Sequence, residues 1–461
     1  MMCAAALAAS AASPKYVFLF IGDGMSVPQR MTAEEFSRKS GGGSLAMNAL
    51  PFSAMTRTCS ATSLVTDSAA AATAIACGVK TYNSAIGVDA DKKPVESCAV
   101  AAKKAGKKVG IISTVTITHA TPAGFYAHRK NRGDTYGIAI DLADSGFDFF
   151  VGGGLDVDDK KSKKHAQFAD CGNAYEYAAK KGYGIVESKD AFMALKPGCG
   201  RVLTKFTNGP LENAIDADGS QPTLAELVTK AIEVLDGDSG FFVMAEGGRI
   251  DWAGHANDAA TNLRDVLALD EAVKVALKFQ DSHPDDTLVV VTGDHETGGM
   301  SMGFAGTGYA LYMDRLANQT MSVNKFANKA TKMFKINPDL NFDDVKPLIG
   351  EAFGLKFDGD EKADPMVLSK KEAGEIKKAF EHDVKFHKSK IEENSKYDGE
   401  KRYKLADACR IVLSHKCGIG WSSSAHTAMP VLTTAKGCGA EKFSGFIENT
   451  DISKALKGFY E

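Results

Sequence analysis

The chain has 461 residues, of which 44% are hydrophobic and 25% are charged, so it carries enough apolar material for a large buried core. Its formal net charge of -3 is close to balanced, which gives no bulk electrostatic basis for a nucleic-acid-specific partner or for binding to a charged membrane surface. No run of about 18 apolar residues follows the N-terminal stretch, so we expect no membrane span.

The first twelve residues, MMCAAALAASAA, are apolar and rich in alanine, which is typical of the end of a secretory signal with a cleavage site near Ala12. A disordered tail is the alternative, because the usual basic segment is missing. We interpret residues 1–12 as a signal-peptide remnant and expect a periplasmic or secreted protein. Loss of this segment removes Cys3 and leaves eight cysteines, an even number that favours disulfide bonds in an exported protein.

Short apolar runs that are typical of buried strands alternate with longer helical patterns along the chain. The runs lie at 16–21, 109–115, 147–151, 241–245 and 288–291, and the clearest helical patterns lie at 224–235 and 258–279. This alternation predicts an α/β fold with a largely parallel central sheet sandwiched by helices. Ligands in such folds bind beyond the carboxyl ends of the strands.

Ionisable and hydroxyl side chains, usually beside glycine, follow four of these runs. They include Asp23 after the first run, His119 and Thr121 after the second, Glu246, Asp251 and His255 after the fourth, and Asp294 and His295 after the fifth. Histidine with aspartate suits zinc, and carboxylates with hydroxyls suit magnesium. A single Asp–His pair is usually a surface pair or a helix cap, but four clusters at strand ends predict a site that holds several metal ions.

Ser68 directly precedes an alanine-rich stretch that predicts a helix. A helix N-terminus favours an anion, so Ser68 is a candidate nucleophile that could carry a phosphate. The alternative is that Asp67 or Ser68 merely caps the helix. Catalysis by a Ser-His-Asp triad is not expected, because the sequence has no Gly-x-Ser-x-Gly turn.

Lysine, aspartate and glutamate become dense between residues 304 and 405. A capping-box pattern at Ser369 and Glu372 starts a helical spacing there, so we interpret 304–405 as an inserted, mostly helical subdomain. His382 and His387 fall in this insert, and we interpret them as part of a solvated face rather than a metal site. Residues 13–303 and 406–461 would then form the catalytic domain, with 421–426 and 430–434 returning to the sheet.

The segment Thr66-Asp67-Ser68-Ala69-Ala70 resembles the nucleophile motif of alkaline phosphatases. Five further segments resemble motifs of the same family, namely 21–25, 78–83, 120–123 with Arg132, 246–251 with His255, and 292–299. The motifs follow the family order from residue 16 to His426, so the resemblance covers nearly the whole chain.

The resemblance implies a phosphate monoester hydrolase that works through a phosphoserine at Ser68, with two zinc ions and one magnesium ion. The implied metal ligands are Asp251, His255 and His426 at one zinc, Asp23, Asp294 and His295 at the other, and Asp23, Thr121 and Glu246 at the magnesium, with Ser68 also a metal ligand. Arg132 matches the arginine that clamps phosphate, and Asp67 matches the carboxylate that steadies that arginine. The resemblance further implies inhibition by inorganic phosphate and a homodimer in which the 304–405 insert is the interface crown.

Two positions depart from the best-known bacterial pattern and resemble the marine Vibrio-type branch. His119 stands where that pattern has aspartate, which places a histidine behind the magnesium ligands and weakens the expectation of tightly held magnesium. Trp252 stands where it has lysine, which removes a cation from the substrate-binding region near the phosphate.

Three alternatives share parts of this pattern. A sulfatase would use a Cys/Ser-x-Pro-x-Arg motif, which 26–30 matches, but the Leu-Thr-Gly tail of sulfatases does not follow. A phosphodiesterase relative usually has threonine as its nucleophile, which Ser68 with Arg132 argues against. A non-enzymatic module would have lost ligands, and none is missing.

Overall fold

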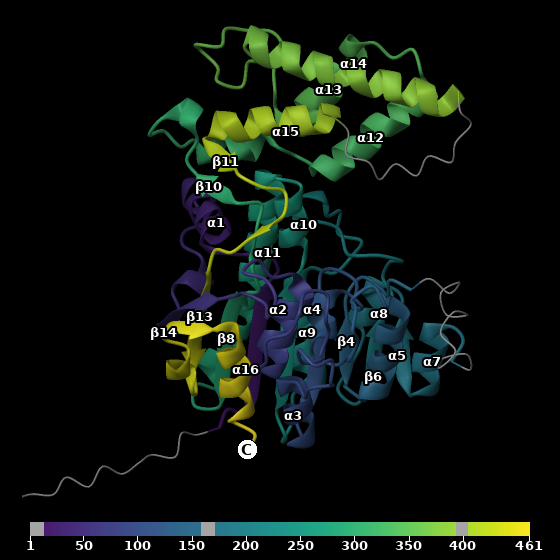
Figure 1. The fold of residues 1–461 in the computed structure, drawn as a ribbon, viewed down its shortest axis with the longest axis vertical. Helices are drawn as coiled ribbons and strands as arrows, with labels where there is room; N and C mark the ends of the chain where they lie inside the picture. The colour runs from purple at the N-terminus through teal and green to yellow at the C-terminus, as the bar shows by residue number, and fades with distance from the viewer. Residues whose placement is uncertain (1–12, 158–170, 393–403) are drawn as a thin grey trace, which may run out of the picture.

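A ten-stranded sheet forms the centre of the structure, a computed structural model that describes residues 13–157, 171–392 and 404–461 (Figure 1). In spatial order its strands are β14 (Gly445–Glu448), β2 (Phe52–Arg57), β13 (Val431–Gly437), β8 (Thr287–Gly293), β1 (Tyr16–Gly22), β7 (Phe241–Gly247), β3 (Lys108–Ser113), β4 (Phe149–Val151), β6 (Arg201–Thr204) and β5 (Tyr183–Val186). β13 is antiparallel to both of its neighbours, and the other neighbouring pairs in this sheet are parallel. The expected largely parallel sheet is therefore confirmed, while the expected signal-peptide remnant lies outside the described residues.

Strand β1 is fully buried because helices cover both faces of the sheet. Phe18 and Phe20 pack into the hydrophobic core on one face, and Leu19 and Ile21 pack into the core on the other, as the alternation of side chains along a strand requires. A strand that is buried on both faces has a continuous apolar sequence rather than an alternating one. This is why the apolar run at 16–21 locates β1 to within one residue.

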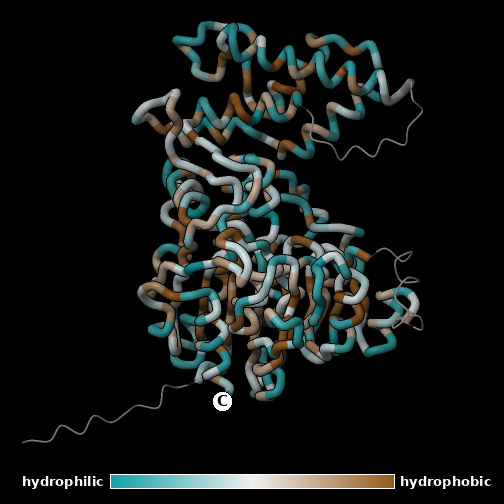
Figure 2. The backbone as a smooth tube through the Cα atoms, viewed as in Figure 1, coloured by the Kyte–Doolittle hydropathy of each residue, from teal (hydrophilic) through white to brown (hydrophobic). Residues whose placement is uncertain are grey.

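Two helical layers enclose the sheet. The first contains α1 (Val27–Lys39), α8 (Lys189–Met193), α9 (Leu224–Leu235), α10 (Arg249–His255) and α11 (Ala259–Ser282). The second contains α2 (Ser68–Cys77), α3 (Cys98–Lys104), α4 (Ala120–Ala123), α5 (Thr135–Ser145), α7 (Ala174–Lys180) and α16 (Asn449–Lys457). Short 3-10 turns lie at Ala46–Asn48, Ala214–Asp216, Ala305–Thr307, Met313–Asn318 and Ala440–Lys442. Figure 2 shows hydrophobic segments between these layers and hydrophilic ones on the outer loops, as a sandwich requires.

The four strands that precede the ionisable clusters lie side by side, in the order β8, β1, β7 and β3. Gly22 at the end of β1 is level with Gly293 of β8 and with Gly247 of β7. Glu246 is in turn level with Ser113 at the end of β3. The loops that follow these strands therefore meet at one edge of the sheet, which is where a parallel α/β sheet binds its ligand.

Four helices form a further layer beyond this edge (Figure 1). They are α12 (Val323–Ile336), α13 (Phe342–Phe353), α14 (Lys370–Glu392) and α15 (Lys404–Cys417). The chain enters and leaves this layer through two short antiparallel ladders, β10 (Met300–Met302) with β11 (Ile419–Trp421), and β9 (Glu296–Thr297) with β12 (His426–Thr427). We call residues 304–417 the crown.

The capping box predicted in the crown is present. Glu372 accepts hydrogen bonds from the backbone and hydroxyl of Ser369 at 2.8 and 2.9 Å, and α14 begins at the next residue. Helix α15 continues the crown past residue 405, and the buried Phe326 belongs to the same hydrophobic cluster as Phe18 of the sheet. The crown thus shares a core with the catalytic part, and the domain boundaries at 303 and 405 stay a prediction.

Two expectations about the end of the chain and the crown are corrected. Residues 430–434 do return to the sheet as part of β13, but 421–426 do not, because β11 and β12 pair in the two separate ladders. His382 is exposed as expected, whereas His387 is buried and stacks on the Phe334 ring with centroids 4.6 Å apart. The residues around His387 in the sequence are mostly charged, so the sequence did not predict its contact with the Phe334 ring.

The eight cysteines that the structure describes form no disulfide with one another, which corrects that expectation. Cys77, Cys98, Cys409 and Cys417 are buried in the two cores, where they pack as small apolar residues. Burial raises the pKa of the Cys77 thiol to about 12, so it stays protonated. In the parts of the chain that are described, none of the helices is both long and apolar enough to cross a membrane.

Candidate active site

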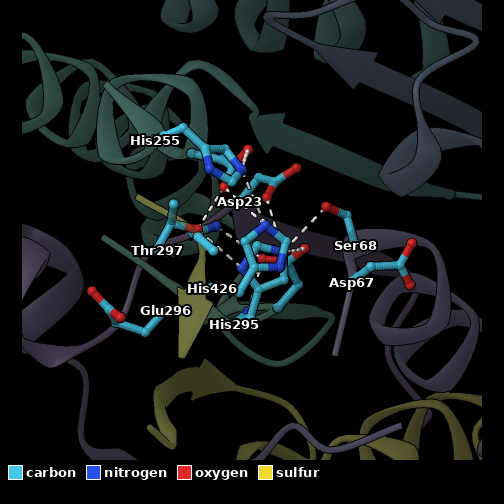
Figure 3. Close-up of polar contacts among 12 residues, drawn as sticks. Asp23, Asp67, Ser68, His255, His295, Glu296, Thr297 and His426 are labelled. Atoms are coloured by element: carbon cyan, nitrogen blue, oxygen red, sulfur yellow. Dashed lines mark hydrogen bonds and ion pairs between the residues drawn. The ribbon is translucent and has the colours of Figure 1, made fainter. Parts of the chain in front are cut away.

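Ser68 is the first residue of α2 and lies at the edge where the central strands end. Asp67 caps this helix, since its Oδ1 accepts a hydrogen bond from the backbone N–H of Ala70 at 3.0 Å. The Ser68 hydroxyl is buried and lies 3.1 Å from Nε2 of His295 (Figure 3). Because a helix N-terminus carries partial positive charge, this position stabilises an alkoxide or a phosphate group on Ser68.

Arg132 is held as a planar fork between two side chains. Its Nη1 lies 3.2 Å from Oδ2 of Asp67, and its Nη2 lies 3.2 Å from Nε2 of His119. Burial, and then the charge of Arg132, lower the pKa of His119 to about 3, so the imidazole is neutral and can accept this hydrogen bond. The arginine side chain is 29% exposed, which leaves N–H donors for an incoming phosphate.

His255 and His426 face one another beside Asp251. Nδ1 of His255 lies 2.7 Å from the carbonyl of Ser424, and Nδ1 of His426 lies 2.9 Å from the carbonyl of Thr66. Each Nδ1 therefore carries the hydrogen, and each Nε2 carries the lone pair. The two Nε2 atoms are 3.2 Å apart and lie 3.4 and 3.5 Å from the Asp251 carboxylate. Two lone pairs at this distance call for a cation between them.

A second group forms around His295, whose ring stacks on that of His426 with centroids 3.6 Å apart. Its Nε2 lies 3.4 Å from Asp23 and 3.2 Å from Asp294. Burial raises the pKa of both carboxyls well above the usual range, and repulsion from the neighbouring acidic groups adds to the rise. Gly24 has φ +72 and donates to Asp294 at 3.0 Å, and any β-carbon there would lie 2.8 Å from Asp251, so only glycine fits.

A third group contains Asp23, His119 and Glu246. The Thr121 hydroxyl donates to Asp23 at 3.3 Å, and the Ser113 hydroxyl donates to Oε2 of Glu246 at 2.5 Å. Burial raises the pKa of Glu246 to about 7. Nδ1 of His119 lies 4.0 Å from Oδ2 of Asp23, so the histidine expected behind the magnesium ligands lies within reach of the same site.

Buried polar atoms without a hydrogen-bond partner mark where metal ions fit. At this edge of the sheet they include Oδ1 of Asp23, Oε1 of Glu246 and Oδ2 of Asp294. The donor atoms fall into three sets, each within 4.8 Å, formed by Asp251, His295 and His426, by Asp23, Asp294 and His295, and by Asp23, His119 and Glu246. Divalent cations offset the repulsion between these buried carboxylates, and the histidine-rich sets suit zinc while the third suits an oxygen-preferring ion. The residues present therefore fit a centre with several metal ions.

Trp252 lies next to this centre without entering any of the three donor sets. Its ring packs edge-on against His119 with centroids 6.0 Å apart. The guanidinium of Arg249 lies 4.9 Å from the ring centroid, which is a cation–π contact. Trp252 therefore contacts both Arg249 and His119, and His119 in turn contacts Arg132.

Sequence reasoning missed side chains that hold the ligands in place. The Thr297 hydroxyl donates to Asp251 at 2.5 Å and lies 3.2 Å from Nδ1 of His295, so it fixes the hydrogen of that ring on Nδ1 (Figure 3). Ser113 holds one oxygen of Glu246 in the same way. Thr297 lies inside a family motif and Ser113 ends a strand, but neither position signals the carboxylate that it holds, because Asp251 and Glu246 are distant from them in sequence.

These features are those of a metal-dependent hydrolase, with a serine hydroxyl at a helix N-terminus beside the candidate metal ligands. The family model described as alkaline phosphatase matches residues 14–461, so the chain belongs to the alkaline phosphatase family and is a phosphatase.

Known relatives agree with this assignment. Alkaline phosphatase 3 of Bacillus subtilis is 33% identical over 399 residues, which cover 85% of this chain and 76% of the relative. The alkaline phosphatase of Escherichia coli is 31% identical over 340 residues, covering 61% of this chain and 70% of the relative. The crystal structure of a cold-active alkaline phosphatase from Shewanella sp. superposes with a TM-score of 0.79 at 27% identity, covering 97% of this chain and 100% of that one. The family prediction is confirmed, and the closer likeness to the Vibrio-type branch stays a prediction.

Proposed function

We propose that this phosphatase hydrolyses phosphate monoesters through a phosphoserine at Ser68, with two zinc ions and one magnesium ion. The observation that carries the proposal is the position of the Ser68 hydroxyl, 3.1 Å from Nε2 of His295 and beside two buried carboxylates that need cations. A nucleophile at this point can lose its proton at little cost, because the helix N-terminus and the metal centre both stabilise the anion.

The proposed ligand sets follow the groups described above. They are Asp251, His255 and His426 for one zinc, Asp23, Asp294, His295 and Ser68 for the other, and Asp23, Thr121 and Glu246 for magnesium, with His119 directly behind. A variant of the alkaline phosphatase from the Antarctic bacterium TAB5, in which a histidine is replaced by aspartate, has been solved with magnesium bound; it is 25% identical to this chain with a TM-score of 0.65, and it supports only that a protein of this fold can hold magnesium. Bound at these positions, the ions supply positive charge to the entering and leaving oxygens of an in-line displacement.

The protein side chains bind and orient the substrate. Arg132 binds two oxygens of the phosphate as a fork, and Asp67 and His119 keep that fork in one orientation. Ser68 attacks the phosphorus and releases the alcohol, and water then attacks the phosphoserine and restores the free hydroxyl. Inorganic phosphate binds the same groups as the substrate and therefore acts as a product inhibitor.

The proposal also covers where the enzyme works and how it assembles. We propose a periplasmic or secreted homodimer in which the crown contributes to the interface. The apolar start of the sequence supports export, and the position of the crown, beyond the edge of the sheet and apart from the metal ligands, supports a role in assembly (Figure 1).

The discriminating experiment compares p-nitrophenyl phosphate, the corresponding sulfate and the bis-ester as substrates. We expect kcat/KM to be highest for the monoester by several orders of magnitude. Removal of metals with a chelator should abolish turnover, and zinc plus magnesium should restore it. Full activity after exhaustive metal removal, or a preference for the sulfate, would contradict the proposal.

A further inference from the structure

Glu296 is a buried carboxylate that receives four hydrogen bonds and lies next to the metal ligand His295. Its side chain is 1% exposed. The donors are Nε2 of Gln29 at 2.7 Å, the backbone N–H of Met300 at 3.1 Å, the backbone N–H of Gly299 at 3.0 Å and the hydroxyl of Thr427 at 2.5 Å. Four donors satisfy the charge of a buried carboxylate without a cation, so Glu296 is held in one position.

Three of the four donors come from the two points where the chain leaves for the crown and returns from it, and the fourth, Gln29, comes from α1. Gly299 and Met300 lead into β10, which starts the crown. Thr427 lies in β12, directly after the return, and is paired in register with Glu296. The residue before Thr427 is His426, one of the ligands proposed for zinc. The crown is inserted in the sequence between His295 and His426, so an interaction is needed that holds the returning strand β12 next to His295.

We propose that Glu296 is the positioning residue for His426, and that it holds the returning strand β12 against β9 through Thr427. This inference rests on the proposed metal centre and adds to it the group that keeps one ligand in place. The rings of His426 and His295 stack with centroids 3.6 Å apart, and Nε2 of His426 lies 3.2 Å from Nε2 of His255. A small shift of β12 would therefore separate His426 from the other ligands. Groups that hold a metal ligand from behind typically change metal affinity by about 10–100-fold when they are removed.

Only a carboxylate satisfies this position. A glutamine has one oxygen and one NH2 group, and either end of the amide would point the NH2 at a backbone N–H, of Gly299 or of Met300. Two donors then face one another in a buried place, which is unfavourable because a buried hydrogen bond is left unmade. Glu296→Gln keeps the volume of the side chain and removes the four-donor arrangement.

The test measures zinc release from the metal-loaded enzyme to a coloured chelator. We expect wild type to release its zinc slowly and Glu296→Gln to release one equivalent about 10–100-fold faster, with the second equivalent little changed. Thr427→Val breaks only the bond to β12 and should speed up the same equivalent, while Thr427→Ser should restore the slow rate. Gln29→Met removes the bond from α1 to Glu296 together with the bonds of Gln29 to the carbonyl of Thr297 and the backbone N–H of Ser26, and it leaves Thr427 bound to Glu296, so it should lower the melting temperature without speeding zinc release.

Three results would overturn the inference. Zinc release from Glu296→Gln at the wild-type rate would show that Glu296 does not hold a ligand. A fast Glu296→Gln with a slow Thr427→Val would show that it does not act through β12. Loss of both equivalents together with the melting temperature, in Gln29→Met as well, would show a general role in folding. A wild-type enzyme that binds no zinc would instead refute the proposed function, so the two failures are distinguishable.

Discussion

Replacement of Trp252 by lysine tests whether the absence of a cation near the phosphate governs product release. The ring of Trp252 contacts Arg249, 4.9 Å from its centroid, and also His119, which in turn contacts Arg132 at 3.2 Å. A lysine ammonium placed there is repelled by Arg249 and drawn toward the phosphate side. At roughly 7 Å from a phosphate dianion and a dielectric constant of about 80, the attraction is about 1.2 kcal/mol, or about eightfold in affinity.

The assay is the inhibition constant of inorganic phosphate, measured with metal content as a control. We expect Trp252→Lys to lower this constant by about 5–10-fold and to lower kcat, since tighter product binding slows its release. Trp252→Phe keeps a ring and adds no charge, so it should leave the constant near the wild-type value. Adding His119→Asp should enlarge the effect of the lysine, because it changes the third metal group too. If Trp252→Lys leaves the constant unchanged with metals intact, Trp252 acts only by packing and the charge argument is refuted.

Three further predictions follow from the site, the crown and the core. Ser68→Ala should remove most turnover while zinc and magnesium content stays nearly unchanged, and phosphate trapped at low pH in wild type should map to the Ser68 peptide, not to another residue. Joining β10 to β11 by a short turn in place of 304–417 should weaken dimerisation in sedimentation experiments while the zinc ligands stay bound, and an unchanged dissociation constant would contradict a crown interface. Asp265 is buried, and its Oδ1 accepts a hydrogen bond from the backbone N–H of Ala214 at 2.7 Å. Burial raises the pKa of Asp265 to about 7. The free energy of unfolding of wild type should therefore fall as pH rises from about 4 to about 7 and stay lower above pH 7. The difference in free energy of unfolding between Asp265→Asn and wild type should therefore shift in favour of the variant by about 2–3 kcal/mol from pH 5 to pH 9 in urea titrations. A difference that is the same at pH 5 and pH 9 would rule this out.

The sequence predicts the parts of the fold in which local pattern and burial agree. The run at 241–245 and the helical pattern at 224–235 correspond to β7 and α9, because a strand buried on both faces and an amphipathic helix each leave a clear periodicity. Ser68 is predicted at a helix start because alanines follow it, and α2 begins there. The sequence also predicts that the ionisable clusters lie at strand ends. Their convergence at one place depends on the strand order, which the structure shows to be β8, β1, β7 and β3.

Features that depend on distant partners could not be predicted. β5 is short and partly exposed, so its sequence carries little apolar signal. The antiparallel direction of β13 depends on the route of the chain through the crown, which periodicity does not encode. Glu296 looks like an ordinary member of a motif until Thr427 and Gln29 are seen to converge on it from positions far away in the sequence.

The position of β13 has a consequence for how the chain folds as it is synthesised. β13 contains residues 431–437 but lies between β2 and β8, both of which leave the ribosome much earlier. The hydrogen-bonding edge of β8 therefore stays unpaired throughout synthesis of the crown, and such an edge invites pairing with other chains.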